Sequence, residues 1–448
     1  MPFILLLIGP AAIIYFIARD GLGISMGDSV AYLQMAENIR NSFCVCIYAG
    51  CGKRIPIEHW PWGYPLFISF LNPKVANPIL AFITNVIILK ILEAGKLKGI
   101  KAYIGVLVVS LSPVYINVFT HLWSEALFVP ILLLTIYFWI KGRLIPLTFL
   151  TGAMPIIRYS GIFSWVMAEK PIILVLSTLP FIFWKVRNML TNALSWRDIA
   201  YHPPNSEHLR VFSETLYGFF GINWLWYPES VELKIAIFTF VMVFAILVSK
   251  RLKITKPLTL LVSSYGLLLT ASITFYDHST TPNLRILSPI YFLSFILIIL
   301  AVSRFGNFLF LSILSPIAYG YIRDMRHYRV EGYNSIRFSD PKFVEMLKGL
   351  KERYVYSNAP DFIWYRTGIY AEFIPRIYEP HNARKNPNFY EEIEALRDTM
   401  AKRNGVIVWI NGIHRGHLPD KDYLVKRLKL RLLFEGGDGS IWVYTGLE

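Results

Sequence analysis

Charged residues are scarce in this sequence. Only 17% of the 448 residues are Asp, Glu, Lys or Arg, against roughly 25% in an average soluble domain. Hydrophobic residues make up 54% and gather in long runs. This composition excludes an ordinary soluble globular protein and predicts helices that cross a lipid bilayer.

Cysteine is nearly absent, and its three copies, Cys44, Cys46 and Cys51, all stand within eight residues. A zinc site would need a fourth ligand, for which His59 is the nearby candidate, and no second cysteine pair completes the usual spacing. On the outer side of a membrane, one disulfide with one thiol left over is the favoured interpretation. We therefore predict no metal among the site residues, while a divalent cation such as Mg²⁺ or Mn²⁺ stays open as a cofactor.

The sequence also lacks a phosphate-cradling glycine loop, an internal repeat and a low-complexity stretch. No basic region or small-residue cleavage site accompanies the first apolar run, so we interpret that run as a retained span. Basic residues outnumber acidic ones, 45 to 30, for a net charge of +15. Because much of this excess stands in short loops between apolar runs, it indicates membrane orientation and contact with anionic lipid, and no nucleic-acid partner.

Apolar runs long enough to cross the hydrocarbon core as helices recur along the chain. The candidates, about eleven, lie near 3–18, 76–92, 102–118, 125–140, 144–157, 161–168 with its flanks, 171–184, 234–249, 257–275, 286–302 and 308–322. The short pair around 144–168 is interrupted by Pro155, Arg158 and Glu169.

Every second loop is basic if the N-terminus is cytoplasmic, as the positive-inside rule requires. These loops carry Lys96, Lys98, Lys101, Lys141, Arg143, Lys170, Lys250, Arg251, Lys253, Lys256 and Arg304. An odd number of spans then places the C-terminus outside. The sequence predicts an α-helical multi-pass cell-membrane protein over 1–322, with a long first outer loop at 19–75, and an extracytoplasmic α/β domain over 323–448.

Helix and strand signals alternate in that C-terminal part. A helix is predicted to begin at Ser339-Asp340-Pro341, and another at Asn386-Pro387. Strands are predicted at RYVYSN and VIVWI, followed by two strands in LRLLFEGGDGSIWVY joined at Gly-Asp-Gly. About 120 residues suffice for a separate hydrophobic core.

Two carboxylates stand at the predicted outer edge of the membrane. Asp28 opens a helix just after the first span and can be a plain N-cap, or a base that deprotonates an acceptor. Glu125 enters an apolar run, where a charge is costly and suggests function, although a carboxylate at a helix start is also favoured by the helix dipole.

Arginines at the same face are candidates for binding an anion. Arg158 lies between two apolar runs and needs a counter-charge, whereas Arg187 and Arg285 can equally snorkel from the ends of their spans. His59, His121, His202 and His278 are also predicted outside, more as interfacial hydrogen-bonding groups than as ligands. The stretch HWPWGYPLF combines an interfacial aromatic belt with a possible sugar platform.

Short motifs occur in a characteristic order over most of the chain. They are D-x-x-x-Y (Asp28, Tyr32), P-x-G-Y-P-L (Pro61, Gly63, Tyr64, Pro65, Leu66), S-E-x-L-F (Ser124, Glu125, Leu127, Phe128), R-x-x-G (Arg158, Gly161), R-N (Arg187, Asn188) and R-x-x-x-P (Arg285, Pro289). In this order they resemble the C-type superfamily of integral membrane glycosyltransferases (GT-C), particularly its protein-mannosyltransferase-like and aminoarabinose-transferase-like branch. S-E-x-L-F alone equally resembles the glycosylphosphatidylinositol-type mannosyltransferases, and the absence of W-W-D argues against an oligosaccharyltransferase.

The resemblance implies a polyprenyl-phosphate sugar donor, such as dolichyl phosphate mannose, and transfer of one sugar with inversion to a protein, lipid or glycan at the outer face. Asp28 would be the base and Glu125 a second acidic residue. Arg158, Arg187 and Arg285 would bind the donor phosphate, and Tyr32, His59, Tyr64 and His121 would line the substrate site. One Asp stands where some branches have an acidic pair. The alternatives are a transporter or flippase of lipid-linked sugar and a non-catalytic membrane anchor.

Overall fold

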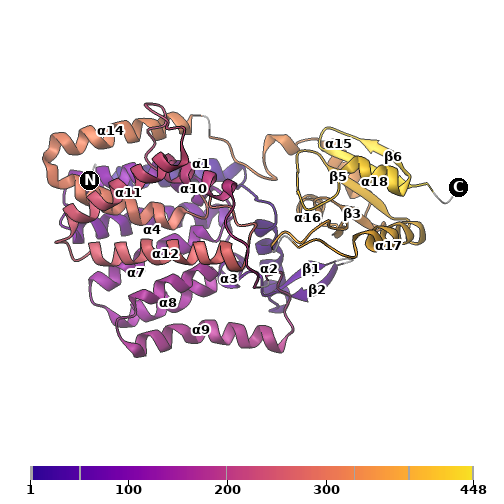
Figure 1. Ribbon diagram of the computed structural model, residues 1–448, viewed down its shortest axis with the longest axis horizontal. Helices are drawn as coiled ribbons and strands as arrows, with labels where there is room; N and C mark the ends of the chain where they lie inside the picture. Colours follow the sequence, from indigo (N-terminus) through magenta and orange to yellow (C-terminus); the bar gives the residue numbers. More distant parts are fainter. Residues whose placement is uncertain (1–3, 50–51, 198, 327, 382–383, 446–448) are drawn as a thin grey trace.

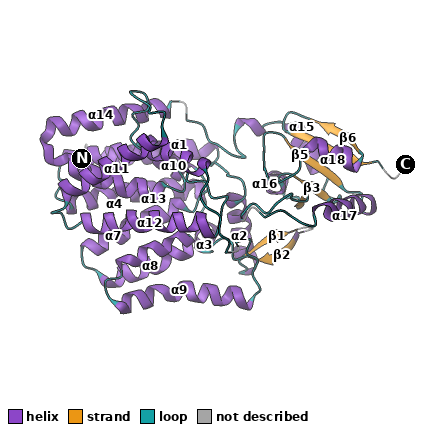
Figure 2. Ribbon diagram, in the orientation of Figure 1, coloured by secondary structure: helices purple, strands orange, loops and turns teal. Residues whose placement is uncertain are grey.

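In the computed structural model, a helical bundle at the N-terminal side adjoins a smaller α/β unit formed by the C-terminal part of the chain (Figures 1 and 2). The structure describes residues 4–49, 52–197, 199–326, 328–381 and 384–445. The two ends of the chain lie at opposite ends of the molecule (Figure 1). Cys51 lies outside the described residues.

The bundle is built from apolar helices interrupted by prolines and short turns. Its helices are α1 (Leu5–Asp20), α4 (Pro73–Ala94), α5 (Ile100–Ser110), α6 (Pro113–Thr120), α7 (Glu125–Ile140), α8 (Leu144–Ile157), α9 (Pro171–Leu190), α11 (Val231–Ser249), α12 (Thr255–Phe275), α13 (Ser288–Val302) and α14 (Gly306–Met325). A 3₁₀ turn, η4 (Ser303–Phe305), joins the last two.

Among the described residues, five helical stretches are long and apolar enough to cross a membrane, and six if one bent pair counts as a single span. That pair is α5 and α6, which bend by 64° at Ser112-Pro113, where proline cannot continue the hydrogen bonding of a helix. The shorter apolar helices include α7 and α8. The chain is thus a multi-pass membrane protein, although the predicted run 102–118 is broken rather than continuous.

The predicted span at 161–168 is wrong as a transmembrane α-helix. Residues Tyr159–Met167 form a 3₁₀ segment, η3, of nine residues, which at about 2 Å per residue is too short for the bilayer core. Helices α8 and α9 lie side by side, with a hydrogen bond of 2.7 Å between Thr151 and Ser177, and η3 packs back against α8, where Gly161 lies close to the Met154 backbone. The segment between them therefore returns through the bundle.

Basic turns gather at the end of the bundle that lies away from the α/β unit. Helices α4, α7 and α13 all begin near that unit, so the turns that follow them lie at the far end, together with the N-terminus (Figures 1 and 2). These turns hold Lys96, Lys98, Lys141, Arg143 and Arg304. This segregation is the one that the positive-inside rule predicts, and which side is cytoplasmic remains a proposal.

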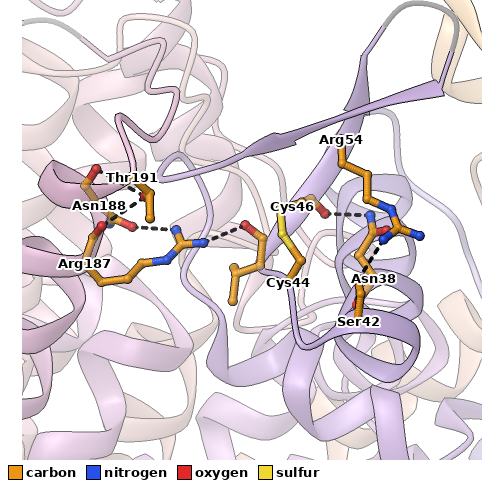
Figure 3. Close-up of a disulfide and its surroundings, with 9 residues drawn as sticks. Asn38, Ser42, Cys44, Cys46, Arg54, Arg187, Asn188 and Thr191 are labelled. Atoms are coloured by element: carbon orange, nitrogen blue, oxygen red, sulfur yellow. Dashed lines mark hydrogen bonds between the residues drawn. A yellow bond between two sulfur atoms is a disulfide. The ribbon is translucent and has the colours of Figure 1, made fainter.

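The first loop, predicted at 19–75, is largely structured. It contains α2 (Asp28–Ser42), the hairpin of β1 (Cys46–Ala49) and β2 (Lys53–Pro56), and α3 (Gly63–Phe70). Helix α2 begins at Asp28, as predicted; it packs against α3 and the hairpin, and it also meets the C-terminal part. Cys44 and Cys46 form a disulfide beside this hairpin (Figure 3). Another loop holds the amphipathic helix α10 (Ser206–Gly218).

The C-terminal part forms a five-stranded sheet in the order β4-β3-β5-β7-β6. Strand β3 is parallel to β4 and β5, and the remaining neighbours are antiparallel. The elements are η5 (Ile336–Phe338), α15 (Pro341–Lys348), β3 (Val355–Ser357), α16 (Pro360–Thr367), β4 (Ala371–Phe373), α17 (Phe389–Lys402), β5 (Val406–Ile410), α18 (Lys421–Leu428), β6 (Leu430–Glu435) and β7 (Gly439–Tyr444).

The predicted elements of this part are confirmed, with small shifts. Asp340 caps α15 with its side chain, and VIVWI is strand β5. Helix α17 begins at Phe389 rather than at Asn386-Pro387. Helices α16 and α18 and strand β4 were not predicted; they are eight, eight and three residues long, too short for a clear hydrophobic period.

Candidate active site

Two carboxylates and two arginines meet where the bundle faces the C-terminal part. Arg285 Nη1 lies 2.7 Å from Asp28 Oδ2, and its Nε donates to Glu125 Oε1 at 2.8 Å. Arg158 forms a second ion pair with Glu125. Four charged side chains that are far apart in the sequence therefore form one continuous network, which we call the Asp28–Glu125 network.

Local structure explains why each member lies there. Asp28 is the first residue of α2 and Glu125 the first residue of α7, so both carboxylates stand at helix N-termini, where the backbone dipole favours negative charge. Arg158 follows the last residue of α8, and Arg285 lies in the loop before α13. Helix ends are the places where apolar spans can present charge without burying it in lipid.

The two carboxylates differ in exposure. The Glu125 side chain is fully buried, and its oxygens accept from both arginines and from Ser124 Oγ at 3.3 Å. The Asp28 side chain keeps 33% of its surface exposed. Its other oxygen, Oδ1, accepts from Trp60 Nε1 at 2.7 Å. Asp28 is therefore the carboxylate that a substrate can reach.

The surroundings keep Asp28 ionised. Burial by itself would raise the pKa of this carboxyl, but the charge of Arg285 and the hydrogen bonds from Trp60 and Arg285 together hold its pKa below the usual value. At neutral pH Asp28 is thus a carboxylate, and it can accept a proton when its contacts with Arg285 and Trp60 are released.

Aromatic side chains line the network. Tyr32 is buried, meets Tyr64 edge-on at 5.2 Å between ring centroids, and donates to Ser124 Oγ at 3.3 Å. Arg285 lies over the ring of Trp123 at 5.3 Å. The hydroxyl of Tyr64 is buried and has no hydrogen-bond partner within the described residues. Both predicted tyrosines thus belong to the wall of the site.

The two predicted histidines lie beside the network rather than in it. His59 is buried between Trp60, Trp196 and His381, with ring centroids 4.6 to 5.1 Å apart. Burial, with the charges of Arg197 and His381, lowers the pKa of His59 well below its usual value, so the ring is neutral at pH 7. His121 stacks on Trp123 at 4.2 Å.

Arg187 does not join the two other predicted arginines. In the part of the chain that the structure describes, its guanidinium donates to Val45 O at 3.2 Å and to Asn188 Oδ1 at 2.9 Å, and it lies over the Trp184 ring. Figure 3 shows this side chain pointing toward the segment that carries the Cys44–Cys46 disulfide. Its evident task in this structure is to tie α9 to the first loop.

Sequence reasoning missed a second charged cluster between the two parts of the chain. Asp277 is buried and pairs with Arg197 at 3.2 Å and with His381 at 3.1 Å. Burial would raise the pKa of Asp277, but the hydrogen bond from His381 and the charge of Arg197 hold it far below its usual value. No local motif marks these residues, since each lies in an irregular loop.

A metal site is not evident in this region. Among the described residues, no group of three or more His, Cys, Asp or Glu side chains is placed to hold a metal ion. The predicted disulfide is present as Cys44–Cys46, whereas the third cysteine lies outside the described residues.

Comparison with known proteins places the fold. No protein-family model matches this sequence, and none of the curated proteins matches it. The structure is similar to the apo crystal structure of ArnT from Cupriavidus metallidurans, with a TM-score of 0.59 and 9% sequence identity over 99% of this chain and 98% of that chain. ArnT is an aminoarabinose transferase of the GT-C family. At this identity the likeness establishes the fold, so the chain has the ArnT-like GT-C fold that the ordered motifs predicted.

Proposed function

We propose that this chain, which has the ArnT-like GT-C fold, is a glycosyltransferase that takes one sugar from a polyprenyl-phosphate donor. It passes the sugar, with inversion, to an acceptor on the outer face of the membrane. The observation that carries this proposal is the Asp28–Glu125 network, in which a reachable carboxylate shares a guanidinium with a buried one. A base beside a phosphate-binding group is what such a transfer needs.

Arg285 is the proposed contact for the donor phosphate. In the Asp28–Glu125 network the two guanidinium charges are balanced by two carboxylates. A phosphate is a strong partner for arginine, and Asp28, being partly exposed, is the carboxylate that can give way. Donor binding would then move Arg285 from Asp28 to the phosphate, while Glu125 keeps Arg158 in place.

This exchange would also activate the base. With Arg285 turned to the phosphate, the main interaction that lowers the pKa of Asp28 weakens, and its carboxylate becomes a stronger base. Asp28 takes the proton of the acceptor hydroxyl or amine while the oxygen or nitrogen of that group forms a bond to the anomeric carbon. The bond from this carbon to the phosphate oxygen breaks, and the polyprenyl phosphate leaves with the electron pair, stabilised by Arg285.

The remaining site residues support substrate binding. Tyr32 and Tyr64 form an aromatic wall beside Asp28, and Trp60 and the neutral His59 ring extend it. Flat rings suit the C–H faces of a sugar. His121 supports this wall through Trp123. For Arg187 we propose a supporting role in the first loop, since its donors are used there. The acceptor can be a protein, a lipid or a glycan.

The orientation follows from charge. The basic turns lie at the end that carries the N-terminus, and we propose that this end is cytoplasmic. The Asp28–Glu125 network and the C-terminal part would then both lie on the outer side.

The test is sugar transfer by the purified protein in lipid, with labelled polyprenyl-phosphate sugars, membrane extract as acceptor, and added Mg²⁺, Mn²⁺ or chelator in parallel. Asp28→Asn keeps the size of the side chain and removes the base. We expect its transfer rate to fall about 10²- to 10⁴-fold, with unchanged thermal unfolding. Equal rates in both proteins would remove Asp28 from the mechanism. No transfer, with donor movement across a sealed bilayer, would favour the flippase.

A further inference from the structure

The segment before Asp28 is held on both sides. Gly23 N donates to Thr120 O and Leu122 N donates to Gly23 O, each at 2.9 Å. On the other side Tyr333 N, from the start of the C-terminal part, donates to Ile24 O at 2.9 Å. The segment thus forms a bridge: one side binds residues 120–122, which precede Glu125, and the other side binds the C-terminal part.

The bridge ends in a tight turn at Gly27. This residue has φ 76° and ψ −80°, and the Asp28 N–H donates back to Met26 O at 3.0 Å. These values describe a γ-turn with positive φ, which residues with a Cβ rarely adopt and which glycine adopts freely. Because glycine leaves the backbone free to adopt other conformations, this one depends on the groups that bind it. Asp28, the proposed base, is the next residue.

Asp361 of α16 holds this turn from the C-terminal part. Gly27 N donates to Asp361 Oδ2 at 2.8 Å, and Tyr333 Oη donates to the same oxygen at 2.7 Å. Arg415 Nη2 donates to Asp361 Oδ1 at 2.7 Å. The Asp361 and Arg415 side chains are only 14% and 15% exposed. The Asp361 carboxylate therefore uses both oxygens, and one of its partners is the backbone of the loop that presents Asp28.

Sheet topology explains why Asp361 and Arg415 are there. The chain leaves β3 toward β4 on one side and then crosses to β5 on the other. In open α/β sheets, ligands bind outside the carboxyl ends of the strands where the order reverses in this way. Asp361 follows β3 and Arg415 follows β5, so they stand at this crevice. At this edge of the sheet the Gly27 N–H donates to Asp361.

We propose that Asp361 is a positioning residue for sugar transfer, and that the C-terminal part acts on the reaction by clamping the Gly27 turn through it. This inference rests on the proposed function. Within the described part of the chain, the side-chain hydrogen bonds and ion pair of Asp361 go to Gly27, Tyr333 and Arg415, and not to the Asp28 side chain. Asp361 fixes the backbone from which Asp28 reaches Arg285 and Trp60, so its loss lets the turn relax and the carboxylate move away from them.

Four variants of the full-length protein in lipid test the clamp. Asp361→Ala removes both acceptors. Asp361→Asn keeps one oxygen for the Gly27 N–H and loses the charge that pairs with Arg415. Gly27→Ala leaves Asp361 intact and alters only the backbone preference, because a Cβ there would meet nothing within 4 Å. Asp438→Asn is the matched control: this buried carboxylate accepts from Asp340 N within the C-terminal part.

For Asp361→Ala we expect kcat to fall about 10²-fold, the cost of a misplaced catalytic group, while KM for the donor stays unchanged because the donor-binding arginines are untouched. Asp361→Asn should recover part of this loss, and Gly27→Ala should resemble Asp361→Ala. The acid limb of the rate profile should move to higher pH, since Asp28 would lose contact with Arg285 and Trp60, which favour its ionised form. Asp438→Asn should retain wild-type kinetics.

Hydrogen exchange of peptides covering 22–33 gives a readout that does not depend on activity. We expect about tenfold faster exchange there in Asp361→Ala, with protection over 340–445 retained. Unchanged exchange and kcat would overturn the clamp, as would equal losses in Asp361→Ala and Asp438→Asn. If wild-type protein transfers no sugar from any donor, the proposed function fails, and the exchange rates alone then decide whether the clamp exists.

Discussion

Asp28 and Glu125 share one guanidinium but lie in different surroundings. Glu125 is fully buried and is held by two arginines and a serine, whereas Asp28 is one-third exposed and is held by one arginine and an indole N–H. A buried carboxylate with two guanidinium partners is fixed, while one at an open edge can exchange partners. The difference supports the proposal that Asp28 transfers the proton and that Glu125 holds the two arginines in place.

The largest expected effect is a loss of folding stability when Glu125, but not Asp28, is replaced. Glu125→Gln leaves Arg158 and the inner face of Arg285 without a counter-charge, and breaking a buried pair in this way costs about 3–5 kcal/mol. We expect a lower yield of folded protein and a lower temperature of unfolding. Asp28→Asn should unfold like the wild type. The measurement is thermal unfolding in detergent, and equal stability of both variants would remove the contrast between the two regions.

Arg285 and Arg158 should likewise differ, the first in its effect on activity and the second in its effect on stability. Arg285 touches both carboxylates and Arg158 only Glu125. Arg285→Gln removes the proposed phosphate contact, and a lost donor of this kind costs about 10²- to 10³-fold in rate. Arg158→Gln should lose less activity and more stability. Donor titrations of kcat and KM, beside thermal unfolding, would show this; a larger rate loss in Arg158→Gln would exchange the two roles.

A change at Trp60 tests the hydrogen bond that holds the second oxygen of Asp28. Trp60→Phe removes the N–H that Asp28 Oδ1 accepts and keeps a ring beside His59 and Trp196. A hydrogen bond to a charged group contributes about 1.5–3 kcal/mol. Its loss should raise the pKa of Asp28, so activity should fade at a higher pH as the solution is acidified. Rate profiles from pH 4 to 8 measure this, and an unshifted acid limb would exclude the indole contact.

The smallest expected effect concerns the C-terminal part. Burial, with Arg376, Arg415 and His381 nearby, lowers the pKa of His417 to about 4. An unfolded histidine has a pKa of about 6.5, so the unfolded chain takes up the proton first. The stability due to the neutral ring is present above about pH 6.5 and is lost as the pH falls toward 4. Below about pH 6.5 the unfolding temperature of the wild type should therefore fall more steeply than that of His417→Gln, and parallel curves would contradict this assignment.

The ordered motifs predicted the members of the Asp28–Glu125 network but not its pairing. Glu125 and Arg158 were chosen because a charge beside an apolar run is costly and needs a partner. Asp28 and Arg285 were chosen because they stand at the predicted outer edge of the membrane. The packing of these four distant segments decides which carboxylate is buried. It also decides that Arg285 contacts both carboxylates. Arg187 satisfied the same sequence criterion and lies elsewhere, because a charge at the end of a span only marks an edge of the membrane.

The sequence by itself determined the membrane class, most apolar spans, the segregation of basic turns and the strands of the C-terminal part, because each depends on composition or on a period along one segment. Only tertiary structure decided that 159–167 forms a 3₁₀ return, that Asp277 meets Arg197 and His381, and that Asp361 holds the Gly27 turn. These contacts join segments up to 334 residues apart. Their free energy comes from charges and backbone donors brought together away from water, and no local pattern records that proximity.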